Sequence, residues 1–362
     1  MKRRQVLGAA AAVAAAPLMT RPAAAAERIE WKMVTSWPQD APGVGTGARR
    51  LAELIGALSG GRLTVRLFPA GELVPPLQVL DAVQQGTAEM AHTALYYAAG
   101  KAPALHFFTT IPFGMDLSEL AAWLSFGGGQ VLKDEILAPF GVQSFYAGNS
   151  GTQAMGWFRR EIRSLDDVKG LKMRIAGLGG AALTKLGATA VLVPPGEIFG
   201  AMQAGTVDAA EWVGPWNDIA FGLHKVARYY YLPSFHEPGP ALDAVVSRKA
   251  LEALPADLQA MVRAACTAAA LDTSSEFLFH NVESYAMLAD YGVQVSVLPD
   301  EVVQALGRAS DEVLAELMGS DPGARKVGEA YLAFLARADA YAQPMAQAML
   351  MQRAAVRSAA GG

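Results

Sequence analysis

Three short segments carry residues that could bind a small anion together with a metal ion. They are the stretch GNSGTQ at residues 148–153, the arginine of LKMRIAG at Arg174, and the run DAAEWVGP that contains Glu211 and Trp212. An amide pair, a guanidinium on a predicted strand and an isolated carboxylate beside an aromatic ring are suited to holding a carboxylate and a cation. These residue types therefore predict a carboxylate receptor that also holds a metal ion.

Arg174 follows a short run that we predict to be a β-strand. Because side chains alternate along a strand, Lys172 and Arg174 point to one face and Met173 points to the other. A guanidinium near the end of a strand can donate two parallel hydrogen bonds to one carboxylate. The alternative interpretation is a surface arginine that pairs with Asp166 or Glu161.

Glu211 is an isolated acid among Ala, Trp, Val and Gly, with few charged residues close to it in the sequence. Burying an unpaired carboxylate is costly, and a bound cation would remove that cost. Hard cations such as Na⁺ and Ca²⁺ take oxygen ligands, which Gln153, Glu237 and the main-chain carbonyl of Trp212 can supply. The pattern is equally compatible with a Glu211 that caps a helix or forms a salt bridge.

A glycine-rich segment keeps a second hypothesis open, an exported NAD(P)-dependent oxidoreductase. The sequence GLGGAA, which begins at Gly177, fits the dinucleotide-binding pattern GxGxxA directly after the predicted strand. The acid expected to bind the ribose would be Glu197, but it lies in PPGEIFGAMQAG, which reads as the start of a helix. The five histidines lack the spacing of a zinc site, and the GxSxG and GxxxxGK motifs are absent.

Strand-like and amphipathic helical runs alternate along the chain, which predicts α/β architecture with a largely parallel sheet. The alternation begins again near residue 148, so we expect two α/β domains with a ligand cleft between them. A helical tract near the C-terminus should be interrupted at Pro344. We expect a first domain of residues 27–147 and about 241–270, a second of 148–240 and about 271–318, and a C-terminal helical extension of 319–362.

The first 26 residues have the form of a twin-arginine export signal. Basic residues including Arg3 and Arg4 precede an apolar run that ends at Leu18, and small residues follow up to Ala26. The signal holds four basic residues and no acid, so its removal changes 30 Lys and Arg against 34 Asp and Glu to 26 against 34, or about −8. We therefore expect a soluble periplasmic protein that does not bind nucleic acid.

Several motifs, in the same order along the chain, resemble the solute receptors of tripartite ATP-independent periplasmic (TRAP) transporters, the DctP family. They are AHTALYYAAGKAPA, IPFGM, FGGGQ, AGNSGTQAMGWFRREI, DVKGLKMRIAGLGG and GTVDAAEWVGPWND. Within the family the chain is most similar to the branch that binds 2-oxo acids or lactate. The resemblance implies two α/β domains around a cleft, a long connecting helix, and an extended C-terminal helix through which two copies dimerise.

The resemblance also implies roles for individual residues. Arg174 would bind the substrate carboxylate, and Asn149 and Tyr97, with Tyr96 beside it, would contact the substrate. In this branch a cation, Na⁺ or Ca²⁺, bridges substrate and protein, and the matching ligands are Gln153, Glu211, the Trp212 carbonyl and Glu237.

Two stretches of the sequence bear on whether these family roles apply to the matching residues of this chain. The sequence Phe235-His236-Glu237-Pro238 stands where the family has a more aromatic, Gly-rich stretch, which makes Glu237 the least secure ligand. The surface near Trp216 and Phe221 could shift the preferred length of the ligand.

The function implied by the resemblance is that of a receptor and not of an enzyme. It would bind a small monocarboxylate, such as the 2-oxo acid pyruvate or the 2-hydroxy acid lactate, and deliver it to the membrane subunits of a TRAP transporter. A receptor that presents the same ligand to a sensor kinase stays open as an alternative.

Overall fold

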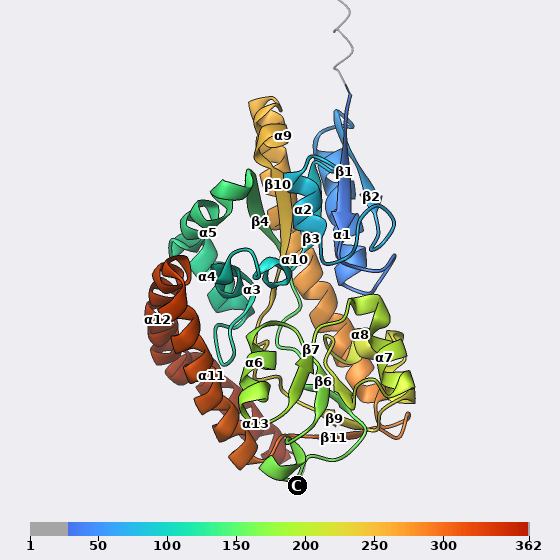
Figure 1. Cartoon of the computed structure of the whole chain (residues 1–362), viewed down its shortest axis with the longest axis vertical. Coiled ribbons are helices and arrows are strands. Elements are labelled where there is room, and N and C mark those ends of the chain that lie inside the picture. Colours follow the sequence, from blue (N-terminus) through green and yellow to red (C-terminus); the bar gives the residue numbers. More distant parts are fainter. Residues whose placement is uncertain (1–27, 361–362) are drawn as a thin grey trace, which may run out of the picture.

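The computed structural model describes residues 28–360, which form two β-sheets with helices around them (Figure 1). We call the part of the chain around the five-stranded sheet the first lobe, and the part around the six-stranded sheet the second lobe. The expected export signal lies outside the described residues. Among the residues described, no helix is long and apolar enough to span a membrane.

The sheet of the first lobe has the strand order β2-β1-β3-β10-β4. Strand β1 is parallel to β2 and β3, whereas β10 is antiparallel to β3 and β4. Four of the five strands therefore run in one direction, so the sheet is largely parallel as expected and β10 is the exception. The reason is that β10 enters from the second lobe and must run against the strands that lead toward it. The strands are β1 (Ile29–Thr35), β2 (Leu63–Phe68), β3 (Met90–Thr93), β4 (Val142–Asn149) and β10 (Ala241–Ser247).

The sheet of the second lobe has the order β11-β9-β5-β8-β6-β7. Strand β5 is antiparallel to β8 and β9, and the other pairs are parallel. Because β6 and β8 are parallel neighbours, their carboxyl ends lie side by side and face the first lobe (Figure 1). The strands are β5 (Gly156–Phe158), β6 (Lys172–Arg174), β7 (Thr189–Val191), β8 (Ala209–Ala210), β9 (Tyr229–Tyr231) and β11 (Gln294–Ser296).

One long helix, α10 (Ala256–Met287), runs along both lobes. It packs against α1 and β4 in the first lobe and against α8 in the second. Its 32 residues correspond to roughly 48 Å at 1.5 Å per residue. The chain also crosses between the lobes in extended form, from β4 to β5 and from β9 to β10.

The remaining helices cover the faces of the two sheets. Helix α1 buries positions spaced by three and four residues, including Ala48, Leu51 and Ile55, as an amphipathic helix should. Helix α4 begins with a capping box in which Asp116 accepts hydrogen bonds from the backbone of Ser118 and Glu119. The helices are α1 (Val44–Leu58), α2 (Val79–Gln84), α3 (His106–Thr109), α4 (Leu117–Phe126), α5 (Gly129–Leu137), α6 (Gly177–Lys185), α7 (Ile198–Ala204), α8 (Pro215–Ala220) and α9 (Arg248–Glu252).

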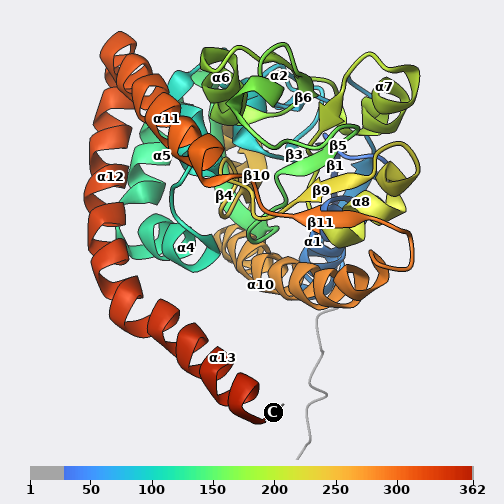
Figure 2. The ribbon, with the colours of Figure 1, turned by 90° about the horizontal axis from the view of Figure 1, so that it is seen from below.

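The C-terminal part contains α11 (Asp300–Ser320), α12 (Pro322–Ala342) and α13 (Ala348–Ala360). Helix α12 is not an extension, because Tyr331 is fully buried among Phe107 and Trp123 of the first lobe. A π-helical turn that contains Pro344 separates α12 from α13, as the sequence predicted. Helix α13 extends away from the rest of the described chain (Figure 2).

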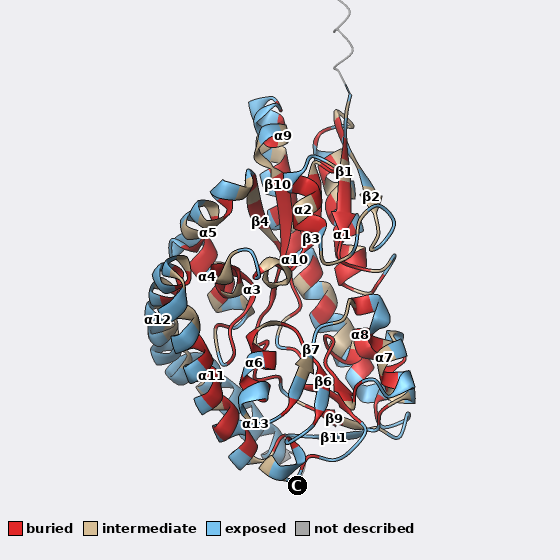
Figure 3. Ribbon diagram, in the orientation of Figure 1, coloured by how far each residue is buried: buried red, intermediate tan, exposed pale blue. Residues whose placement is uncertain are grey.

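The hydrophobic core follows the two sheets. Buried residues concentrate in the strands and on the inner sides of the helices, whereas the outer sides of α11 and α12 are exposed (Figure 3). One core cluster extends from the first lobe, along α1 and α10, to Trp212 and Tyr230 of the second lobe. This shared core positions the ends of β6 and β8 against the first lobe.

Candidate functional site

Arg174 and Glu211 meet at the carboxyl ends of β6 and β8, and each is only 1% exposed. Arg174 Nη1 donates to a carboxylate oxygen of Glu211 and, at 2.8 Å, to the main-chain carbonyl of Glu211. The same carboxylate oxygen accepts the backbone N–H of Ala176 at 2.9 Å. The salt bridge that the sequence left open for Glu211 is therefore present. Its partner, Arg174, was not evident from the sequence because strand pairing alone brings the two residues together.

The surface interpretation of Arg174 is wrong. The two acids that could have paired with it bind other residues, since Asp166 pairs with Lys169 and Glu161 with Arg163.

The ion pair sets the charge of both buried groups. Burial alone would lower the pKa of Arg174, but the Glu211 carboxylate raises that pKa, so the guanidinium stays protonated. Burial alone would raise the pKa of Glu211, yet Arg174 and then His236 bring that pKa below its ordinary value. Glu211 is thus a carboxylate at neutral pH.

Glu237 is a second buried acid beside this pair. It is 1% exposed, and neither of its oxygens accepts a hydrogen bond in the described part of the chain. Burial, followed by the nearby Glu211 charge, raises the pKa of Glu237 well above its usual range, although the neighbouring Tyr96 hydroxyl and then Arg174 act in the opposite direction. An unpaired buried carboxyl is costly, and a cation beside it would remove the cost.

His236 lies between the two acids, although the histidines of the sequence lack the spacing of a metal site. Its Nε2 lies 3.9 Å from a Glu211 oxygen, and its Nδ1 contacts the Ser234 hydroxyl at 2.8 Å. Glu211, His236 and Glu237 offer ligand atoms that all lie within 4.8 Å of one another. In the sequence, the role of His236 is indicated by its position directly before Glu237, a predicted cation ligand.

Gln153 completes the oxygen-rich cluster. Its Nε2 donates to Ser150 at 2.9 Å, while its Oε1 is buried and accepts no hydrogen bond from the residues described. Its backbone N–H donates to the Glu237 carbonyl at 3.1 Å, which ties the two loops together. Buried oxygens of Gln153 and Glu237 that lack a protein donor fit a hard cation such as Na⁺ or Ca²⁺.

A small cavity of about 20 Å³ lies between the lobes, next to this cluster. Tyr96 and Tyr97 enter it from the first lobe, and Gln153 and Trp212 enter it from the second. Trp212 Nε1 and Arg174 Nη2 are buried donors that find no acceptor among the described residues. The site thus combines unused donors, which suit an anion, with unused acceptors, which suit a cation.

Asn149 does not line this cavity. Its side-chain amide donates to the Gly239 carbonyl and accepts from the Gly151 backbone, both at 2.8 Å. Asn149 therefore holds together the two extended segments that cross between the lobes.

Trp216 and Phe221 also lie away from the cavity. Trp216 packs on Phe277 and His280, and Phe221 packs behind Trp212. The cavity wall instead includes Trp37, which follows β1 in the first lobe.

The GxGxxA segment serves packing. A side chain at Gly177 would come within 2.9 Å of Tyr96, and one at Gly179 would collide with His236. The glycines therefore let α6 approach the site closely, and the space that a pyrophosphate would need is filled by these side chains. The dinucleotide-binding interpretation is not supported.

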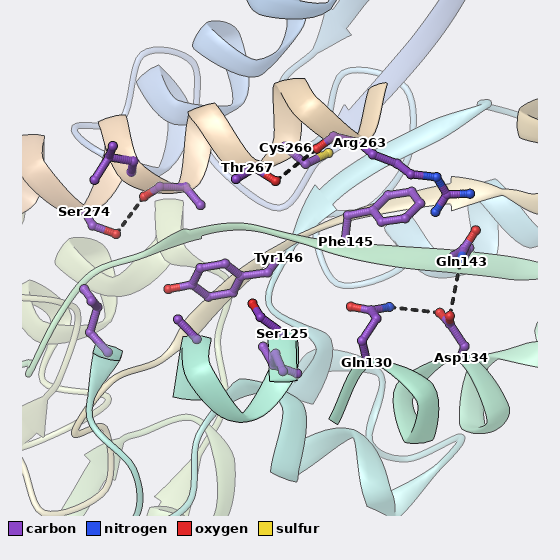
Figure 4. Close-up of a pocket in the computed structure, with 15 residues that line it drawn as sticks. Ser125, Gln130, Asp134, Gln143, Phe145, Tyr146, Arg263, Cys266, Thr267 and Ser274 are labelled. Carbon is purple, nitrogen blue, oxygen red and sulfur yellow. Dashed lines mark hydrogen bonds between the residues drawn. The ribbon is translucent and has the colours of Figure 1, made fainter. Parts of the chain in front are cut away.

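A larger pocket lies elsewhere, between α4, α5, β4 and α10 (Figure 4). It measures about 520 Å³ and is mainly apolar. On one side the Arg263 guanidinium lies 4.8 Å from the centre of the Phe145 ring. None of the predicted site residues lines it.

Comparison with known proteins agrees with this arrangement. A family model described as DctP, bacterial extracellular solute-binding protein, family 7, matches residues 33–321. A monocarboxylate 2-oxoacid-binding periplasmic protein of Nostoc is 41% identical over 342 residues, which are 92% of this chain and 94% of the Nostoc protein.

Solved structures of TRAP solute-binding proteins superpose closely. A protein from Bordetella bronchiseptica with copurified calcium and picolinate has a TM-score of 0.90 and 35% identity, covering 92% of this chain and 99% of its own. A protein from Colwellia psychrerythraea with calcium and pyruvate has a TM-score of 0.87 and 38% identity, covering 90% and 100%. One from Pseudoalteromonas atlantica with sodium and pyruvate has a TM-score of 0.87 and 37% identity, covering 90% and 99%.

These matches confirm the two-lobe α/β fold and the family resemblance expected from the sequence. The relatives bind either calcium or sodium together with a carboxylate, which agrees with the paired anion and cation features of the site. The chain therefore belongs to family 7 of the bacterial extracellular solute-binding proteins, the DctP family.

Proposed function

We propose that this protein is a periplasmic receptor that binds a small monocarboxylate as a complex with Na⁺ or Ca²⁺ and delivers it to a TRAP membrane permease. The ligand class is a 2-oxo acid such as pyruvate, or the corresponding 2-hydroxy acid. Export through the twin-arginine signal is part of the proposal. Its main support is the cluster of buried groups with unused bonding capacity around Arg174 and Glu237.

The donors would hold the acid and the acceptors would hold the cation. Arg174 Nη1 donates to Glu211, whereas Nη2 has no acceptor among the described residues and would donate to the ligand carboxylate. Oxygens of Gln153, Glu211, Glu237 and the Trp212 carbonyl would ligate the cation. A bound cation would neutralise the buried acids and share oxygens with the ligand.

Hydrogen bonds join the two lobes and would stabilise the state in which they close over the ligand. Phe113 N–H donates to the Phe235 carbonyl at 2.7 Å, and Asn217 Nδ2 donates to the Pro42 carbonyl at 2.6 Å. Such contacts form only when the lobes approach, so a ligand that touches both lobes favours the closed state.

Removal of the cation is the direct test of this function. With chelator and without sodium, we expect the affinity for pyruvate to fall by about 100-fold, because the ligand would lose the cation that joins its oxygens to Gln153 and Glu237. Isothermal titration calorimetry with and without Ca²⁺ measures the change. Equal affinity in both conditions would show that no cation takes part, and a failure of all 2-oxo and 2-hydroxy acids to bind would refute the receptor.

We also propose that the protein forms a homodimer through α13. Residues 349–358 of this helix are all exposed, and Met349 and Val356 lie seven residues apart on one of its faces. Helix α10 carries an exposed apolar stripe at the spacing of a helix-packing seam, formed by Leu271, Leu278, Val282 and Tyr285. The stripe begins at the apolar pocket of Figure 4, which Leu271 lines. An α13 from a second copy would cover this surface.

Replacing Met349 or Leu278 by aspartate is expected to convert the dimer to a monomer, because each change places a charge in an apolar contact. Size-exclusion chromatography with light scattering gives the mass. Leu73→Asp, at an exposed position in the first lobe outside the stripe, is the control and should remain dimeric. A wild-type mass of one chain would refute the proposal.

A further inference from the structure

Helix α8 contributes a fully buried acid, Asp218, that lies outside the cavity between the lobes. One of its oxygens accepts hydrogen bonds from Trp157 Nε1 at 2.9 Å and from the Tyr230 hydroxyl at 2.8 Å. Its other oxygen accepts the backbone N–H of Val213 at 3.1 Å. The carboxylate therefore joins strands β5 and β9 to the segment that follows Glu211.

The Val213 N–H belongs to the same peptide group as the Trp212 carbonyl, which is one of the proposed cation ligands. This peptide is trans. In a trans peptide the N–H and the C=O point in opposite directions within one rigid plane. The hydrogen bond to Asp218 therefore fixes the plane of the peptide and directs the Trp212 oxygen away from the Asp218 carboxylate.

The carbonyl groups on both sides of Trp212 are used inside the protein. The Glu211 carbonyl accepts from Arg174 Nη1 at 2.8 Å, and the Val213 carbonyl accepts the Ala154 N–H at 2.9 Å. Among the described residues, no backbone N–H donates to the Trp212 carbonyl. Trp212 and Val213 both line the cavity between the lobes. The Trp212 oxygen thus keeps its capacity to accept, while the residues on each side of it are held in place.

The contact between Asp218 and Val213 does not depend on the charge of the acid. Burial raises the pKa of Asp218 to about 7, although the three groups that donate to it act in the opposite direction. A protonated carboxyl still has an oxygen that accepts a hydrogen bond. The peptide is therefore expected to keep its orientation in either state of the acid.

We propose that Asp218 is a positioning residue of the cation site, which holds the Trp212–Val213 peptide so that the Trp212 carbonyl can ligate the cation. This inference rests on the proposed function and adds to it a residue that acts through the backbone of a ligand. Partners of this kind fix the orientation of a metal ligand, and their loss commonly lowers metal affinity by about 10- to 100-fold.

The Trp212–Val213 peptide can be observed by itself, because the dipeptide Trp-Val occurs once in the sequence. Protein with isotope labels on the tryptophan carbonyl carbon and on the valine nitrogen gives a single NMR correlation across a doubly labelled peptide bond. Adding Ca²⁺ and pyruvate to the wild type should shift the carbonyl resonance of this peptide. Calorimetry on the same sample gives the affinities.

Asp218→Leu removes the acceptor of the Val213 N–H and keeps a side chain of similar size. Its affinity for Ca²⁺ should fall by about 10- to 100-fold, and the response of the Trp212 carbonyl signal to Ca²⁺ should be lost. Tyr230→Phe is the matched control, because it removes one hydrogen bond to the other Asp218 oxygen and leaves the Val213 contact in place. It should keep the wild-type response and an affinity within about threefold.

A double variant serves if Asp218→Leu does not fold. Combining Asp218→Leu with Tyr230→Phe removes a hydroxyl that would otherwise be buried without an acceptor. Its comparison with Tyr230→Phe alone then reports the loss of the Asp218 carboxylate. A merely structural role for Asp218 would lower the stability of the variant to urea and leave Ca²⁺ affinity and the carbonyl response unchanged.

The outcomes separate this inference from the proposed function. If the wild type binds Ca²⁺ and pyruvate but the Trp212 carbonyl signal does not move, this inference fails alone. It also fails alone if the Asp218 variants keep the Ca²⁺ affinity of Tyr230→Phe. If no 2-oxo or 2-hydroxy acid binds the wild type, the receptor function fails with it.

Discussion

Replacing Arg174 by lysine is expected to lower the affinity for the carboxylate ligand by about 10- to 100-fold while the protein still folds. Lysine keeps the positive charge that Glu211 requires in this buried place. Its single ammonium would bind Glu211 and leave no donor where Nη2 now faces the site. A lost charge-assisted hydrogen bond is worth about 1.5–3 kcal/mol, and each 1.4 kcal/mol is about a tenfold change.

Calorimetry with pyruvate and Ca²⁺, together with a thermal melt, separates binding from folding in this variant. Arg163→Lys, at a surface arginine paired with Glu161, is the control and should bind as the wild type does. If Arg174→Lys binds pyruvate within about threefold of the wild-type affinity, Arg174 is not the residue that binds the ligand carboxylate. Arg174→Ala is less informative, because it would leave Glu211 buried without its ion-pair partner.

Replacing Glu237 by glutamine is expected to weaken cation binding by about 100-fold and yet to stabilise the metal-free protein by at least ~1 kcal/mol. The substitution removes one charge from the cation site, while it also removes a buried carboxyl whose oxygens have no protein donor. Loss of function with a gain in stability would identify Glu237 as a residue kept for its ligand. Calorimetry with Ca²⁺ and urea unfolding in chelator measure the two effects.

The gain in stability should increase with pH. The folded-state pKa of Glu237 is raised above its unfolded value, so above the unfolded pKa the native state holds a proton that the unfolded state has released. Stability of the metal-free wild type therefore falls as pH rises from the unfolded pKa toward the folded one. Glutamine does not titrate, so the stability of Glu237→Gln should exceed that of the wild type by the smallest amount at acidic pH.

Glu211→Gln provides the contrast, because Glu211 is paired with Arg174. Here cation affinity and stability should both decrease, since the guanidinium loses its counter-charge. If Glu237→Gln behaves in the same way as Glu211→Gln, Glu237 is a structural acid and not a cation ligand.

Much of the fold followed from local patterns. Alternating strand and helix runs predicted two α/β units, and Pro344 predicted the break in the C-terminal helices. The direction of β10 did not follow, because a strand that returns from another lobe has the same residue pattern as one that continues the first. The burial of α12 was equally hidden, since its apolar face suits either a partner molecule or the first lobe.

The sequence identified several residues of the candidate site but not the contacts between them, for a similar reason. Arg174 and Glu211 were found because each stands at the end of a short strand with unusual chemistry for its surroundings. Their pairing was missed, as was the role of Trp37. Asn149, chosen from the same segment as Gln153, turned out to tie the crossing strands together.

The sequence by itself determined the types of group available, namely one guanidinium, an amide and two acids in otherwise apolar segments, together with the family to which their order belongs. Only the tertiary structure decided which of them meet and which remain unpaired. Strand pairing joins Arg174 to Glu211, and two loops place Gln153 beside Glu237. The bonding capacity left for a ligand depends on contacts between residues far apart in the chain, because each internal hydrogen bond removes a donor or acceptor that a local pattern counts as free.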